Sequence, residues 1–121
     1  MLSLPSSVRI FLCLEHTDMR RGFDALARMA REVLEQDPLS GHLFVFRGRR
    51  GDRLKILYWD HHGLAIWYKR LEKGTFAFPV AEGRSLCIGA ADLSLILEGI
   101  DLAQVRRRKR YEKSGADAFC A

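Results

Sequence analysis

A cluster of arginines is the feature of this sequence that most directly suggests chemistry. Within seven residues the chain carries four of them, together with two glycines and one aspartate: Arg47, Arg49, Arg50 and Arg53. The guanidinium group is a planar fork of N–H donors, which phosphate oxygens accept in pairs. A glycine-containing hairpin tip can follow a phosphate backbone with such groups, whereas the alternative is a solvated loop in which Asp52 neutralises one arginine. The cluster therefore predicts contact with phosphate.

The charge of the chain is concentrated at its C-terminal end. The net charge is +5, and from Ala103 onward six basic residues outnumber two acidic ones, so this end contributes +4 and the remainder only +1. A cationic tail suggests an acidic partner, nucleic acid first, against the alternative of a solubilising end. The candidate nucleic-acid contacts therefore include five residues of the tail: Arg106, Arg107, Arg108, Lys109 and Arg110.

The length and composition indicate one globular domain. The chain has 121 residues, of which 48% are hydrophobic and 29% charged. No apolar run approaches the roughly 20 residues of a membrane helix, and the start has no basic segment before its apolar part, so we predict a cytoplasmic protein without a membrane partner. The hydrophobic pattern fades after Leu102. We predict a single α+β domain over residues 1–102 and a basic tail over 103–121 that is disordered or lengthens a helix.

Hydrophobic patterning predicts a strand, a helix, a series of strands and a second helix. Apolar residues recur at steps of three and four between Phe23 and Leu34, which indicates an amphipathic helix, capped by Thr17 or Asp18 and ended by Asp37-Pro38. Apolar runs joined by glycine-containing turns indicate an antiparallel meander of about four to five strands. The expected strands are 8–14, 43–47, 54–59, 64–68, 75–79 and 84–88, and the second helix is 90–98. This order is typical of an α+β fold, in which we expect the helices on one face of the sheet.

Aromatic residues alternate with charges along the expected strands. They are Phe44, Phe46, Tyr58, Trp59, Trp67, Tyr68, Phe76 and Phe78. On an open sheet face such rings would stack on unpaired bases, but alternate aromatics on strands more often form the core. Exposure of Phe46, Tyr58, Trp59 or Trp67 would favour another function, that of a protein-interaction subunit that binds its partner protein without touching DNA.

The remaining reactive side chains lack the spacing of a known motif. The four histidines and three cysteines form neither Cys-x-x-Cys nor His-x-x-x-His. A metal-dependent nuclease component would need carboxylates such as Asp18, Asp24, Asp60 and Glu98 to converge, yet two of these suit a helix start and one a turn. We therefore predict no catalytic residue, no cofactor and no metal, and keep the nuclease as the least favoured alternative.

Several stretches between about Pro5 and Asp101 together form a specific pattern. They are residues 16–24 (HTDMRRGFD), 37–38 (DP), 41–53 (GHLFVFRGRRGDR), 57–60 (LYWD), 63, 69–72 (KRLE), 74, 76 and 97–100 (LEGI). This pattern resembles the accessory proteins of insertion-sequence-sixty-six elements. The family is the second open-reading-frame product, called TnpB, and is distinct from the RNA-guided nuclease of the same name.

The resemblance implies a setting rather than a mechanism. Members of the family accompany a transposase and are implicated as accessories to transposition, which implies transposon DNA, the transposase and other accessory proteins as partners. It implies no catalytic residues. Relatives tend to open the second helix with Ser or Thr, whereas Gly89-Ala90-Ala91-Asp92 stands here, so we expect a weaker cap. A homo-oligomer through a sheet edge is left open.

This setting extends the candidate phosphate contacts beyond the arginine cluster. Arg20 and Arg21 match the family pattern at the start of the first helix, where a helix N-terminus and an arginine can together hold a phosphate. Lys69 and Arg70 would extend the same strip if the sheet brings them near. The predicted function is a non-catalytic accessory protein of transposition that contacts nucleic acid through these residues and its tail.

Overall fold

A five-stranded sheet organises the chain. The computed structural model describes residue 5 and residues 7–100, with strands in the order β4-β3-β2-β1-β5. The elements are β1 (Ile10–Cys13), α1 (Phe23–Glu32), β2 (Leu43–Arg47), β3 (Arg53–Asp60), β4 (Gly63–Arg70), β5 (Ser85–Ile88) and α2 (Ala90–Leu97). The predicted α+β class is confirmed, as is a sheet of about five strands. The predicted boundary after residue 102 and the tail lie outside the described residues.

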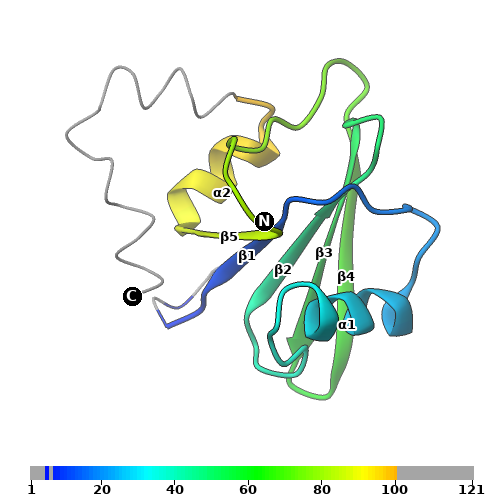
Figure 1. The fold of residues 1–121 in the computed structure, drawn as a ribbon, viewed down its shortest axis with the longest axis vertical. Coiled ribbons are helices and arrows are strands. Elements are labelled where there is room, and N and C mark those ends of the chain that lie inside the picture. Colours follow the sequence, from blue (N-terminus) through cyan, green and yellow to red (C-terminus); the bar gives the residue numbers. More distant parts are fainter. Residues whose placement is uncertain (1–4, 6, 101–121) are drawn as a thin grey trace.

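The sheet is mixed rather than wholly antiparallel. Strand β1 pairs parallel with β2, while the pairs β2–β3, β3–β4 and β1–β5 are antiparallel. The parallel pair follows from α1, because the helix carries the chain from the end of β1 back to the level at which β2 begins. The antiparallel meander therefore comprises β2, β3 and β4. Strand β1 lies next to β2, and β5 pairs with the other edge of β1 (Figure 1).

The two helices cover opposite faces of the sheet, so the prediction of helices on one face was wrong. Alternate residues of the strands separate into two buried clusters. One packs on α2 and contains Ile10, Leu12, Leu43, Val45, Leu54, Ile56, Ile88, Leu93 and Ile96. The other packs on α1 and contains Phe11, Cys13, Leu26, Ala30, Phe44, Phe46 and Leu57. The central strands are apolar on both faces, and such strands need a cover on each side.

Two local predictions were also wrong. Residues 75–79 form no strand; their chain is irregular and is held by Phe76, which is buried and whose N–H donates to the Gly51 carbonyl over 2.7 Å. Helix α1 begins after Gly22, without a side-chain cap from Thr17 or Asp18, and ends before Asp37 because Glu35 takes a left-handed conformation with φ of 56°. The weak cap expected for α2 is confirmed, since Gly89 offers no side chain there.

Helix α1 is too short to cover its face of the sheet. Ten helical residues span about 15 Å, whereas the eight residues of β3 or β4 span about 27 Å. Figure 1 shows α1 across the lower half of the sheet and the β2–β3 connection at the upper end. The upper part of the α1 face is consequently left for polar side chains. No described helix is long and apolar enough to cross a membrane.

Candidate nucleic-acid interface

The β2–β3 hairpin carries two arginines at its tip. The Gly48 N–H donates to the Arg53 carbonyl over 3.1 Å, and the Gly51 N–H donates to the Gly48 carbonyl over 3.0 Å, which closes a four-residue turn. Arg49 and Arg50 occupy the two central positions of this turn and are exposed. Gly51 has φ of 81°, where glycine is favoured, and a Cβ there would lie 3.1 Å from that of Thr75.

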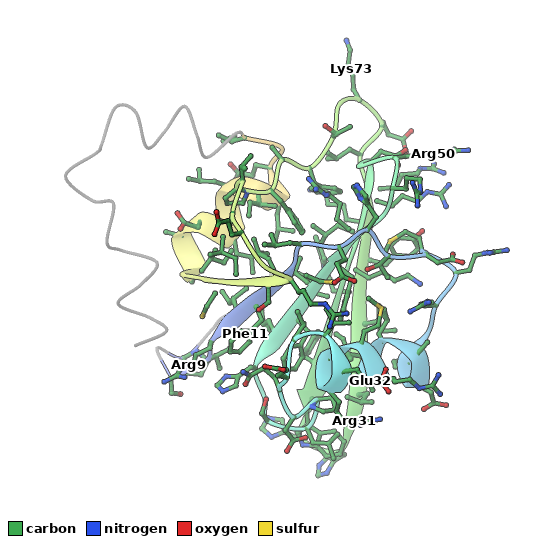
Figure 2. The ribbon with its side chains drawn as sticks, in the orientation of Figure 1. Arg9, Phe11, Arg31, Glu32, Arg50 and Lys73 are labelled. Carbon is green, nitrogen blue, oxygen red and sulfur yellow. The ribbon has the colours of Figure 1, made fainter. Side chains whose placement is uncertain are left out.

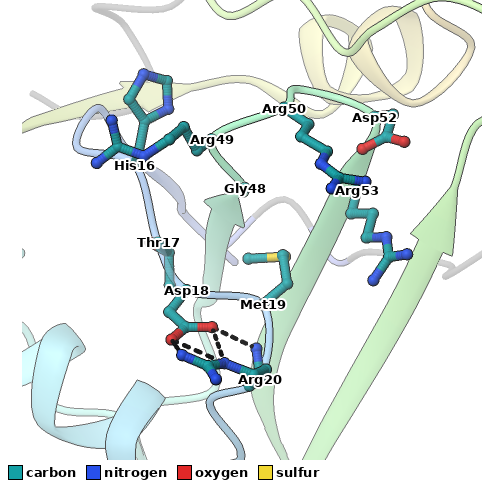
Figure 3. Close-up of a pocket in the computed structure, with 10 residues that line it drawn as sticks. All are labelled: His16, Thr17, Asp18, Met19, Arg20, Gly48, Arg49, Arg50, Asp52 and Arg53. Atoms are coloured by element: carbon teal, nitrogen blue, oxygen red, sulfur yellow. Dashed lines mark hydrogen bonds and ion pairs between the residues drawn. The ribbon is translucent and has the colours of Figure 1, made fainter.

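The hairpin packs against the segment that joins β1 to α1. The Thr17 N–H donates to the Arg47 carbonyl over 2.9 Å, and a Cβ on Gly48 would lie 2.7 Å from Met19 Cγ. Between the two segments is a cavity of about 590 Å³. Figure 3 shows its lining: His16, Thr17, Asp18, Met19, Arg20, Gly48, Arg49, Arg50, Asp52 and Arg53. Three of the four clustered arginines thus come together at one cavity.

Arg53 extends this site along the sheet. In the antiparallel β3–β4 pair it lies directly opposite Arg70. A second cavity, of about 420 Å³, is lined by Arg53, Tyr68, Arg70 and Glu72, so Arg53 borders both cavities. Its Nε and Asp52 Oδ1 are shielded from solvent and have no hydrogen-bond partner among the residues that the structure describes.

The charge around the two cavities is positive. Their linings contain five arginines, Arg20, Arg49, Arg50, Arg53 and Arg70, against three carboxylates, Asp18, Asp52 and Glu72, which leaves a net charge of +2. Like charges placed directly opposite each other on a sheet, as Arg53 and Arg70 are, destabilise it. An anion bound between them would relieve this repulsion.

Arg20 is partly neutralised within the site. Its guanidinium pairs with Asp18 over 2.8 Å, and the Asp18 carboxylate also accepts the Arg20 backbone N–H over 2.9 Å. These interactions hold the pKa of Asp18 at about 2, well below its ordinary value. Both side chains face solvent, so the pair can exchange for a phosphate at little cost.

Three other predicted contacts lie elsewhere or are engaged. Arg47 points to the α2 face, where Nη1 donates to the Phe76 carbonyl over 3.0 Å and the guanidinium lies 4.3 Å from the Phe78 ring centre. Burial lowers the pKa of Arg47. Lys69 donates to the Leu97 carbonyl at the end of α2 over 3.0 Å. Arg21 is exposed beside α1, and its carbonyl accepts from Lys55. The tail residues Arg106, Arg107, Arg108, Lys109 and Arg110 lie outside the described part.

Two further residues complete the site: Lys55, which the sequence did not single out, and Tyr68, which it offered only as one of eight aromatics. Lys55 is only 8% exposed; its Nζ donates to the Arg21 carbonyl over 2.8 Å and lies 4.7 Å from the Tyr68 ring centre. Tyr68 is 48% exposed and accepts from Arg53 Nη1 over 3.4 Å. Strand alternation was the available signal, because Lys55 follows Arg53 by two residues and therefore shares its face.

The alternative functions find less support in this arrangement. Phe46 is buried, and Tyr58, Trp59 and Trp67 are half-buried, so none of the four aromatics named for a protein-interaction surface is exposed. Within the described residues, no three His, Cys, Asp or Glu side chains come close enough together to hold a metal ion. Asp18, named for the nuclease alternative, is instead paired with Arg20.

The fold and the site together define a small α+β protein with an arginine-lined hairpin and no recognisable catalytic constellation in its described part. The chain belongs to the IS66 Orf2-like protein family, whose model matches residues 8–107. The resemblance predicted from the sequence is thereby confirmed, and family membership supports the setting of an insertion-sequence accessory protein.

Two relatives are similar over nearly the whole chain. The uncharacterized protein y4hO of Sinorhizobium fredii is 44% identical over 115 residues, which cover 95% of this chain and 100% of that protein. The uncharacterized protein y4jC of the same organism is 35% identical over 108 residues, which cover 89% of this chain and 92% of that protein. No solved structure matches the chain significantly.

Proposed function

We propose that this protein is a non-catalytic accessory of insertion-sequence transposition that binds transposon DNA through its β2–β3 hairpin. The observation that carries the proposal is the meeting of Arg49, Arg50 and Arg53 at one cavity beside the β1–α1 segment. Guanidinium groups on a fixed hairpin suit phosphate oxygens, which accept their N–H donors in pairs. Transposase and other accessory proteins of the element are further partners in this proposal.

Binding through these residues is electrostatic, so it responds to salt. Each phosphate contact releases a condensed counterion, and about four contacts give a slope near −3.6 in log affinity against log salt for duplex DNA. Arg49, Arg50, Arg53 and Arg20 or Arg70 would supply these contacts. The tail would add affinity without sequence preference.

The test is binding of the full chain to a labelled duplex from the end of the element and to a scrambled duplex, over a range of salt concentrations. The variant Arg49→Ala/Arg50→Ala/Arg53→Ala should lose about 100-fold in affinity, at about 1 kcal/mol for each charged contact. Its salt slope should flatten by about 2.7.

A matched variant controls for net charge. Arg9→Ala/Arg28→Ala/Arg31→Ala removes three exposed cations that line neither of the two cavities, and Figure 2 shows Arg9 and Arg31 far from Arg50. This variant should keep the wild-type affinity to within a few-fold. Equal losses in the two triple variants, or binding that is independent of salt, would overturn the proposal. Transposase that co-purifies with the protein after nuclease treatment, with no DNA binding, would instead support a pure protein-interaction subunit.

A further inference from the structure

The upper end of the α1 face holds an exposed aromatic ring, that of Tyr68, among cations. Two rows of the β3–β4 pair meet there, Arg53 opposite Arg70 and Lys55 opposite Tyr68. All four side chains belong to the face that α1 leaves uncovered, because residues two apart on a strand share a face. We call these four residues, Arg53, Lys55, Tyr68 and Arg70, the Tyr68 quartet.

The tyrosine ring is held in place from two sides. The Lys55 ammonium lies 4.7 Å from the ring centre, a cation–π contact that fixes the ring plane. Arg53 Nη1 donates to the phenol oxygen over 3.4 Å. Lys55 is itself buried and anchored on the Arg21 carbonyl, so the support does not move freely. The ring is nevertheless about half exposed, so it is both held in place and accessible.

The quartet adjoins the proposed phosphate site without a break. Its cavity is lined by Arg53, Tyr68, Arg70 and Glu72, and Arg53 also lines the hairpin cavity. A chain of nucleotides that lays its phosphates along the hairpin arginines would therefore pass over the tyrosine. An aromatic ring next to a cationic groove is the arrangement by which proteins bind unpaired nucleotides, since every base has a π face. In a duplex the bases are stacked on each other and their faces are not available.

We propose that Tyr68 stacks on an unpaired base while Arg53 and Arg70 hold the flanking phosphates, so that the protein prefers single-stranded to duplex nucleic acid. This inference rests on the proposed function, because it names the form of nucleic acid that the same site takes. Glu72, which pairs with Arg70 over 3.1 Å in the free protein, would be displaced by phosphate.

The experiment measures affinity of the full chain for an oligothymidylate of about 12 nucleotides, for the same length carrying abasic sites, and for a duplex. The oligothymidylate should bind about tenfold more tightly than the abasic oligomer, which has the same phosphates but no bases to stack. Tyr68→Ala should remove this advantage, and its loss of duplex affinity should be smaller than its loss of oligothymidylate affinity. Tyr68→Phe, which keeps the ring, should bind as the wild type does.

Controls separate stacking from a loss of structure. Phe23→Ala removes another exposed aromatic ring, on α1, and should not change any of the affinities. A thermal melt of Tyr68→Ala should show that the variant folds. Binding to an oligouridylate of the same length distinguishes RNA from DNA as the ligand. If the oligouridylate binds more tightly than the oligothymidylate and its affinity also depends on Tyr68, the stacking site is assigned to RNA.

The two proposals fail in different ways. Loss of binding in Arg49→Ala/Arg50→Ala/Arg53→Ala, with Tyr68→Ala equal to the wild type on the oligothymidylate, would overturn the stacking inference and leave the phosphate site standing. Equal affinity for the abasic and the thymidine oligomers would do the same. Failure of every nucleic acid to bind the wild-type chain would overturn both.

Discussion

Next to the β2–β3 hairpin, the two faces of the sheet differ in how they surround an arginine side chain. On the α2 face, Arg47 lies at the end of β2 and its guanidinium is used inside the fold, on the Phe76 carbonyl and the Phe78 ring. On the α1 face, Arg53 lies at the start of β3 and borders two cavities, and its Nη1 donates to the hydroxyl of the exposed Tyr68. The two residues flank one hairpin, yet their surroundings are opposite.

The segment that covers each face determines whether the cations of that face are used inside the fold or remain accessible. The irregular segment that carries Phe76 and Phe78 closes the α2 face, and Lys69 on the same face donates to the end of α2. Helix α1 stops short of the hairpin, so Arg53, Arg70 and Tyr68 remain accessible on the other face. We interpret the α2 face as structural at this end and the α1 face as the binding surface.

The largest expected effect concerns the closure of the α2 face. Phe76→Ala should lower the free energy of unfolding by about 3–5 kcal/mol, because it removes a fully buried ring and leaves a cavity. Chemical denaturation of the variant and the wild type measures this. A loss below about 1 kcal/mol would show that residues 75–79 do not close this face.

The next prediction concerns Arg47 itself. Arg47→Met keeps an apolar stem beside Phe78 but leaves the Phe76 carbonyl without its donor, so unfolding should become easier by about 1–3 kcal/mol. Arg49→Met is the matched control, because it makes the same change at the exposed tip and should alter stability by less than about 0.5 kcal/mol. Equal denaturation midpoints for the two variants would contradict the structural role of Arg47.

The smallest effect concerns the ion pair on the α1 face. Asp18→Asn should raise DNA affinity about two- to fivefold, because it frees Arg20 and removes a negative charge from the cavity. Glu32→Gln removes the same charge from an exposed position on α1 and should have less effect. An unchanged affinity in Asp18→Asn would exclude Arg20 from the interface.

The same pair sets an expectation for pH. The pKa of Asp18 is lowered to about 2 from 3.8, so the contribution of the pair to folding is complete above the ordinary pKa and is lost as pH falls toward 2. Wild-type affinity should therefore not rise through this pair between neutral pH and about pH 4. A rise over that range that Asp18→Asn abolishes would contradict the lowered pKa.

Most of the fold could be predicted from the sequence because its signals are local. The apolar run 43–47 is β2 as predicted, and the runs 54–59 and 64–68 lie within β3 and β4, since glycine-containing turns bound each of them. The parallel pairing of β1 with β2 and the split of the helices between two faces were missed. The predicted order of strand, helix and strand over residues 8–47 already favoured the parallel pair. The face that each helix covers depends on the side on which each connection crosses the sheet.

The types of residue that form the site could be predicted from the sequence, but the face of the sheet on which each one lies could not. Arg49, Arg50 and Arg53 were selected by their density, and the structure brings them to one cavity. Arg47 was selected on the same ground, although strand alternation already placed it on the face of Leu43 and Val45, which the structure shows to be the α2 face. Tyr68 was counted with the aromatics, and its pairing with Lys55 required the β3–β4 register.

The most direct test of the account compares Arg53→Met with Arg47→Met in the salt dependence of duplex binding. Each variant removes one cation from the base of the same hairpin, so the change in net charge is identical. The slope of log affinity against log salt should flatten by about 0.9 in Arg53→Met and stay at the wild-type value in Arg47→Met. Equal flattening in both variants, or flattening in Arg47→Met alone, would contradict the assignment of binding to the α1 face.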